Sequence, residues 1–417
     1  MTYDTGSAAR RAAVACMIAI GAYGTVHAQE APPTGFTFGP GETIEHDSNV
    51  LRLSGTQPGL PVVGDTSYTT DLMASFNQTY GREQVSASAT IGRVLYEHLS
   101  LYDFTQQDIR AALTSSMPYS VEASIDFVRT SALAHFADFE STIRDVIDFN
   151  ALNAKVDFPL EANWRGVLDG SVSQLTNSAV SEQSSDVNTA EIDGGIRFQP
   201  VTGNHVDLLL RSVEGTYPNN SPASLIPPGY HDVGADLRAN WTFSGASHLQ
   251  GRAGFVRRSN DQMFYFNTIT GETELLDRNF SGPAYDLTYT WQVSAASRLT
   301  LFGLRMVGPS GDNNFLTATT HTFKFTPSYQ ASAKIEVDAY YQWTATNYFT
   351  DVYDAVYSQP PGTTLNNYAH SAGLGVIWKP RRWIKVGLDI HRDVRDSDSP
   401  TWTYTNNVAI LSLQSSF

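Results

Sequence analysis

The feature that most constrains the fold of this chain is the regular alternation in length of the connections between its predicted strands. Short segments of alternating apolar and polar residues are joined by polar or Pro/Gly-containing connections, and these connections are alternately short and long. Short turns are predicted at 81–82, 118–119, 158–159, 200–204, 244–247, 295–297, 328–333 and 379–382. Longer connections are predicted at 47–66, 97–101, 134–145, 174–186, 218–229, 259–280, 308–314, 347–366 and 396–400. A soluble β-sandwich gives no reason for this alternation. A barrel with short periplasmic turns and long outer loops does, and these connections would join about 18 strands.

The clearest strand, residues 334–344, shows the period of two. Its odd-numbered residues are apolar or aromatic, and its even-numbered residues are polar, Tyr340 included through its hydroxyl. One such strand fits a sandwich or a barrel equally well, so the connections decide. No stretch after Val26 approaches the ~18 apolar residues of a membrane helix. The chain ends on an alternating segment that closes with Phe417, as the last strand of a bacterial outer-membrane barrel does.

The first residues resemble a secretion signal. Arg10 and Arg11 precede a small apolar stretch, residues 12–26, and Val26 and Ala28 supply the small residues that a signal peptidase needs. We therefore predict a signal peptide at 1–28 and a barrel at 29–417. The single cysteine, Cys16, would leave with the signal, so no disulfide is expected in the mature chain.

Composition and motifs exclude several classes of function. The chain carries 27 Lys+Arg against 42 Asp+Glu, a net charge of −15, which argues against nucleic-acid binding. There is no Gly-x-Ser-x-Gly elbow and no paired His/Cys metal spacing. His391 with Asp389 and Asp393 resembles an acid–base group, but three inward residues on a strand are equally a plain wall segment. We predict no enzyme, no cofactor and no metal.

The charged residues that alternate with apolar ones are predicted to face a polar lumen. Lys or Arg on the lipid side at mid-depth would cost ~2–4 kcal/mol, so these side chains are expected to point inward and to stay hydrated. Wall stability is the simpler explanation for any single residue, whereas together they would line a wide path for a polar solute. The predicted lumen-lining residues are Asp108, Arg110, Glu122, Asp126, Lys155, Arg165, Asp169, Asp193, Arg197, Asp207, Arg211, Asp236, Arg238, Glu336, Asp338, Tyr340, Lys385 and Asp389. The charges of Asp157, Glu161, Glu191 and Lys334 share the same inward parity.

Aromatic residues gather beside the predicted short turns. Trp241, Phe243 and Trp291 precede two of these turns, and Trp378 and Trp383 bracket a third. Such clustering at one end of the strands is typical of the aromatic girdle at a membrane interface.

Several segments resemble one family. The segments are 46–53 (HDSNVLRL), 134–139 (AHFADF), 194–198 (GGIRF), 210–218 (LRSVEGTYP) and 371–380 (SAGLGVIWKP). They are similar to the EpsL-like, exosortase-associated exopolysaccharide proteins of the outer-membrane β-barrel class, and the resemblance extends over nearly the whole mature chain. The first segment departs from the family pattern at Ser48 and Val50.

The resemblance implies an outer-membrane channel that exports an extracellular polysaccharide and is important for biofilm formation. Its partners would be outer-membrane lipids and lipopolysaccharide, the polysaccharide itself, and periplasmic polysaccharide-export or co-polymerase proteins at the short turns. An uptake porin for oligosaccharides or small solutes is the alternative. A structural or adhesive surface barrel, retaining polymer through loops 259–280 and 347–366, is the third hypothesis.

Overall fold

The computed structural model describes residues 35–56, 59–136, 142–201, 203–220, 227–267, 272–276, 279–308, 317–350 and 363–417. The strands are β1 (Gly35–Asp47), β2 (Asp65–Tyr80), β3 (Glu83–Tyr96), β4 (Phe104–Ser116), β5 (Glu122–Leu133), β6 (Val146–Glu161), β7 (Trp164–Asn177), β8 (Val187–Val201), β9 (Asn204–Thr216), β10 (Gly229–Ser244), β11 (Ser247–Asn260), β12 (Met263–Asn267), β13 (Glu272–Leu276), β14 (Phe280–Gln292), β15 (Ser297–Gly308), β16 (Thr317–Ser332), β17 (Ile335–Thr350), β18 (Thr363–Arg381), β19 (Ile384–Ser397) and β20 (Tyr404–Ser415). Four 3₁₀ turns complete the described elements: η1 (Ser100–Tyr102), η2 (Pro118–Ser120), η3 (Gln183–Ser185) and η4 (Pro400–Trp402). No helix among these residues is long and apolar enough to cross a membrane. The predicted signal peptide, 1–28, lies outside the described residues.

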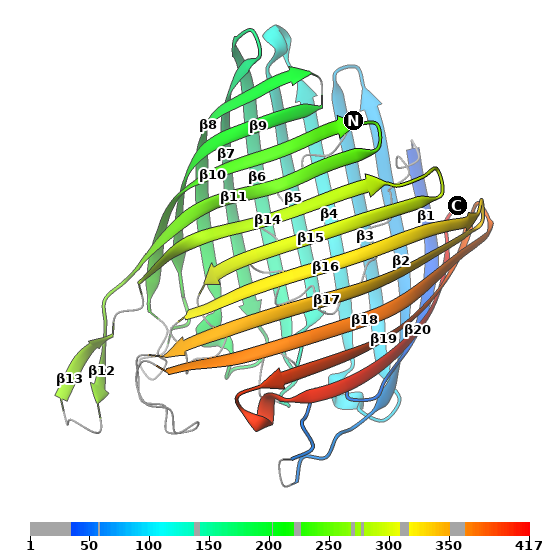
Figure 1. Cartoon of the computed structure of the whole chain (residues 1–417), viewed down its shortest axis with the longest axis vertical. Coiled ribbons are helices and arrows are strands. Elements are labelled where there is room, and N and C mark those ends of the chain that lie inside the picture. Colours follow the sequence, from blue (N-terminus) through cyan, green and yellow to red (C-terminus); the bar gives the residue numbers. More distant parts are fainter. Residues whose placement is uncertain are drawn as a thin grey trace.

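Eighteen strands form one closed antiparallel sheet. Each strand pairs with its neighbour in the chain, except that β11 pairs with β14 because β12 and β13 form a separate hairpin. The first strand, β1, pairs with β2 on one side and with the last strand, β20, on the other. This pairing closes the ring seen in Figure 1, where the β12–β13 hairpin projects from one end of the wall. The predicted barrel of 18 strands is confirmed.

The two faces of the wall follow the period-2 pattern of the sequence. On β6 the side chains of Leu152 and Val156 are exposed on the outer face, while Asp157, the residue after Val156, is buried on the inner face. The same division holds on β20, where Leu411 and Leu413 are about half exposed on the outside. An apolar exterior is stable in lipid and unstable in water, which is the reverse of a soluble domain.

Most predicted connections lie where the sequence places them, and three turns are displaced. The displaced turns fall at 162–163, 333–334 and 382–383. The reason is that β6 continues through the predicted turn at 158–159, and β16 and β18 continue into those at 328–333 and 379–382. A β-bulge occurs near the end of each of these strands, for example between Pro159 and Glu161. A bulge accommodates an unpaired residue, so proline and polar residues that look like turn signals stay within the strand. Two long loops also contain more strand than predicted, since β12–β13 forms inside 259–280 and β17 and β18 extend into 347–366.

The carboxyl terminus is fixed to the start of the barrel. Phe417 donates a backbone hydrogen bond of 2.8 Å to the Phe38 carbonyl and accepts one of 3.1 Å in return. The ring of Phe417 lies 5.6 Å from the ring of Trp383 and 6.1 Å from that of Phe38. These rings stand at the rim that carries the short turns, as does the Trp164–Phe198 pair. The terminal aromatic residue therefore belongs to the aromatic girdle at that rim.

Candidate functional site

The inner wall from β6 to β14 carries two adjacent groups of linked ion pairs, which together we call the wall network. Its members are Asp157, Arg165, Asp169, Asp193, Arg197, Asp207, Asp236, Arg238, Arg252 and Asp286. They meet because the register places inward positions of adjacent strands side by side: Arg197 lies opposite Asp207, which in turn lies opposite Arg238. Alternating charge on neighbouring strands therefore builds a surface of compensated charge, in which each of the six carboxylates and four arginines lies within 4 Å of an opposite charge.

One half of the wall network is centred on Asp157. Its carboxylate accepts from the guanidinium groups of Arg165 and Arg197, the latter at 3.1 Å. Arg197 also makes a bidentate pair with Asp207, at 2.7 and 2.8 Å. Bidentate guanidinium–carboxylate pairs fix geometry as well as charge, so these side chains are held against the wall.

The other half is centred on Arg238. Its guanidinium lies 2.5 Å from Asp193, 3.5 Å from Asp236 and 3.8 Å from Asp169. Arg252 continues the chain of pairs with 3.4 Å to Asp236 and 3.8 Å to Asp286. The Arg238 and Asp193 side chains are 10% and 0% exposed. The expectation that inward charges stay hydrated is therefore wrong at this centre, and its stability depends on the pairing of the charges.

Two further ion pairs lie beside the network. Arg211 pairs with Glu191 at 3.0 Å. Arg258 makes a bidentate pair of 2.7 Å with Asp232 and stacks its guanidinium 3.5 Å from the centre of the Tyr230 ring. Sequence reasoning missed Asp232, Arg252, Arg258 and Asp286. Part of their signal was present, since Asp232 lies four positions before the predicted Asp236 on β10. Arg252 and Arg258 have the parity opposite to the exposed Phe255 on β11, and Asp286 lies beside the exposed Leu287 on β14.

The remaining predicted residues lie elsewhere on the wall. Asp108 and Arg110 on β4 form their own pair at 2.8 Å, with both side chains more than 40% exposed. Asp126 on β5 accepts from Asn153 at 2.7 Å, and Glu336 on β17 pairs with Arg298 at 3.3 Å. The structure places the others on four strands: Glu122 on β5, Lys155 on β6, Asp338 and Tyr340 on β17, and Lys385 and Asp389 on β19. That these residues form the path of a solute stays a prediction.

The acid–base-like group on β19 is a hydrogen-bonded wall segment. His391 Nδ1 lies 2.7 Å from Asp389, and Nε2 lies 3.7 Å from Asp393. The imidazole is 2% exposed and lies between two carboxylates of its own strand. This arrangement orients the ring along the wall.

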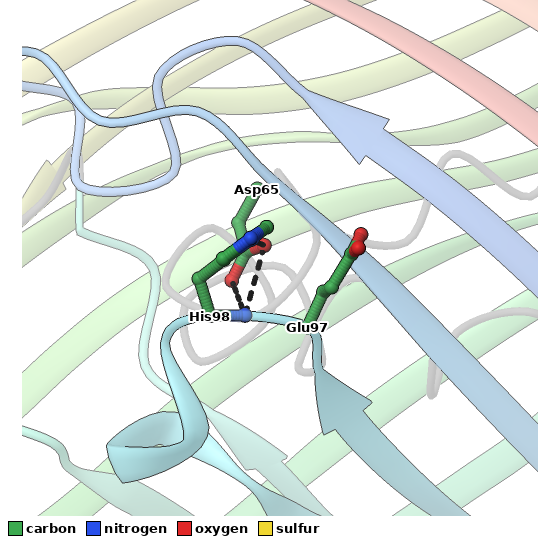
Figure 2. A group of neighbouring side chains, drawn as sticks. All are labelled: Asp65, Glu97 and His98. Carbon is green, nitrogen blue, oxygen red and sulfur yellow. Dashed lines mark hydrogen bonds and ion pairs between the residues drawn. The ribbon is translucent and has the colours of Figure 1, made fainter.

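At the loop end of the barrel, Asp65, Glu97 and His98 are the one group among the described residues whose ligand atoms could hold a metal. The Asp65 oxygens already accept backbone N–H groups of Thr66 and Leu99, both at 2.8 Å, and a His98 ring nitrogen lies 3.0 Å away. Glu97 extends beside this pair, and Figure 2 shows no interaction between its carboxylate and either partner. The hydrogen bond to Asp65 raises the pKa of the His98 imidazole. Because the oxygens of Asp65 are occupied, the group fits a loop anchor better than a metal site.

The segment 46–53, which carries the first family-like motif, is also a loop anchor. Asp47 accepts the backbone N–H of Asn49 and pairs with Arg52, both at 2.7 Å. The Asn49 amide donates to the carbonyls of Leu53 and Thr405, at 2.9 and 3.2 Å. The motif thus ties the loop after β1 to β20 and helps to hold the ring closed.

Among the comparisons with known proteins, only the one with solved structures gives matches, and these support the fold. No protein-family model and no curated protein sequence matches the chain. Among solved structures, a mutant of the ferric enterobactin receptor PfeA of Pseudomonas aeruginosa aligns with a TM-score of 0.51 at 8% identity, covering 93% of this chain and 81% of the receptor. OpdK of P. aeruginosa with vanillate aligns with a TM-score of 0.47 at 9% identity, covering 92% of this chain and 99% of OpdK. OccK2 (OpdF) of P. aeruginosa with glucuronate aligns with a TM-score of 0.48 at 9% identity, covering 92% of this chain and 98% of OccK2.

At such identities the likeness concerns the fold alone. The closed ring, the apolar exterior and the polar inner wall define the chain as a transmembrane β-barrel of the bacterial outer membrane. Its outer face contacts membrane lipids. The EpsL-like resemblance has no support in these comparisons beyond the barrel class.

Proposed function

We propose that this barrel is a passive uptake channel for small hydrophilic solutes, and that it is not an enzyme. The observation that carries the proposal is the closed ring of 18 strands whose inner wall bears compensated charge. Barrels of 16–18 strands enclose an aqueous channel, and an inner wall of paired charges is compatible with water and polar solutes.

The compensated wall favours a general channel over a receptor for one charge type. Each arginine of the wall network lies within 4 Å of at least one carboxylate, so no long arginine surface is left to attract anions strongly. A passive channel has no direction of its own, because solute flows down its gradient. Uptake follows wherever the cell consumes the solute.

Export of an extracellular polysaccharide is the alternative that the EpsL-like resemblance suggests. It would need a bore wide enough for a hydrated polymer and periplasmic export proteins at the short turns. The wall network bears against it, since fixed, buried ion pairs occupy part of the wall that a polymer would need as a hydrated surface. An adhesive barrel, the third hypothesis, would depend on loops such as the one that contains β12–β13. The signal peptide at 1–28 is part of the proposal for either transport role, and mass spectrometry of the mature protein tests it.

A size series distinguishes the two transport roles. The mature protein is reconstituted into liposomes, and swelling is measured in isosmotic arabinose, sucrose, raffinose and a dextran fraction. An uptake channel passes the monosaccharide and slows steeply through the trisaccharide, with no dextran entry. Equal rates for raffinose and dextran would support a polymer conduit, and absence of swelling in arabinose would contradict both transport roles.

A further inference from the structure

Two carboxylates lie on either side of a strand position that is occupied by glycine and therefore has no side chain. Asp338 of β17 and Asp389 of β19 are both in register with Gly375 of β18. A Cβ at Gly375 would lie 2.9 Å from an oxygen of Asp338. The glycine therefore leaves room for the Asp338 carboxylate to lean over the backbone of β18, toward the side on which Asp389 lies.

Asp338 is the acid near Gly375 whose charge is not compensated by a direct contact. The residue is 2% exposed, and within the described part of the chain neither of its carboxylate oxygens has a hydrogen-bond partner. By contrast, Glu336 pairs with Arg298, and Asp389 lies 2.7 Å from a ring nitrogen of His391. Burying an unpaired carboxylate is costly, so a cation bound beside Asp338 would be stabilised.

The neighbouring position supplies an aromatic surface that already receives an ammonium group. Gly373 of β18 lies between Tyr340 and His391, and a Cβ there would lie 2.6 Å from the Tyr340 ring. The Lys324 ammonium lies 4.7 Å from the centre of that ring. This is the geometry of a cation–π contact, so the ring face beside Asp338 suits an organic cation.

We propose that Asp338, Asp389 and Tyr340 form a binding subsite on the inner wall for the ammonium group of small amine solutes. Lys324 would act as a tethered competitor that such a solute displaces from the ring. This proposal rests on the proposed channel function. An ammonium group fits better than a metal ion, because a metal requires several ligand atoms close together. Among the described residues only the loop group of Asp65 meets that spacing.

The test uses single-channel recording with 1,4-diaminobutane as the probe and uncharged 1,4-butanediol at equal concentration as its control. The mature protein in a planar bilayer should show a saturable block by the diamine and none by the diol. D338N and D389N should each weaken the block at least about tenfold, since each removes one charge from the site. K324M should strengthen it. E83Q, which removes an exposed carboxylate at the start of β3, is the matched control and should leave the block unchanged.

Calorimetric titration of the same variants in detergent separates this proposal from the channel function. Diamine binding that weakens in D338N and D389N, in a barrel that does not conduct, would support the subsite and contradict the channel. Equal block of wild type and of folded D338N, or tighter binding of calcium than of the diamine, would overturn the subsite. Heat-modifiable gel migration reports folding. If D338N fails to fold, D389N and Y340L carry the comparison, and unchanged binding in both would equally overturn it.

Discussion

Replacing Arg238 by methionine tests the claim that paired charges stabilise the inner wall. The guanidinium lies within 4 Å of Asp169, Asp193 and Asp236, and its side chain is 10% exposed. Removing one partner of a buried ion pair costs about 3–5 kcal/mol, because the carboxylates left behind are neither paired nor well solvated. Arg238→Met should therefore lower the free energy of unfolding by about that amount.

Arg110→Met supplies the matched control in the same barrel. Arg110 pairs with Asp108 at 2.8 Å, but the two side chains are 49% and 42% exposed. An exposed ion pair contributes about 0–1 kcal/mol, so this variant should be nearly as stable as the wild type. Adding Asp193→Asn to Arg238→Met should recover part of the loss, since one of the uncompensated carboxylates is then neutral.

Reversible urea unfolding of the barrel in lipid vesicles, followed by tryptophan fluorescence, measures these differences. Gel migration with and without heating reports the folded fraction independently. Equal losses in Arg238→Met and Arg110→Met, or no recovery in the double variant, would refute the argument that burial makes the Arg238 pairs important.

Three further outcomes are expected. Leu210→Arg, at a side chain 70% exposed on the outer face of β9, should cost about 2–4 kcal/mol in the bilayer and reduce the heat-modifiable folded fraction, whereas Leu210→Ile should not. Asp65→Asn should lower the NMR titration midpoint of His98, because the hydrogen bond to Asp65 raises the pKa of that imidazole. The stabilisation that this pair gives the loop is complete below the ordinary histidine pKa and is lost as the pH rises through the raised pKa. An unshifted midpoint would contradict this anchor. Deleting Phe417 removes two backbone hydrogen bonds to Phe38 and a ring contact with Trp383, and should reduce the barrel found in outer-membrane fractions; unchanged levels would show that the terminus is dispensable for assembly.

The segments that resemble the EpsL-like family have structural roles in the barrel. Segment 46–53 anchors a loop to β20 through Asp47, Asn49 and Arg52. Segment 371–380 includes Gly373 and Gly375, which leave room for side chains of β17. Requirements of this kind arise from barrel closure and packing, so such motifs indicate architecture more strongly than cargo.

The sequence by itself determined the class of fold, because lipid on one side and water on the other impose a period of two on the strands, and Pro, Gly and polar residues mark most of the turns. The number of strands, the polarity of each face and the aromatic rim follow from patterns within a few neighbouring residues. Only the tertiary structure decided which charges meet. Arg238 and Asp193 are 45 residues apart in the chain, and they pair because β8, β9 and β10 lie in a fixed register that no local pattern encodes. Bulges such as the one after Pro159 shift that register, and their positions depend on the partner strand as much as on the bulged one.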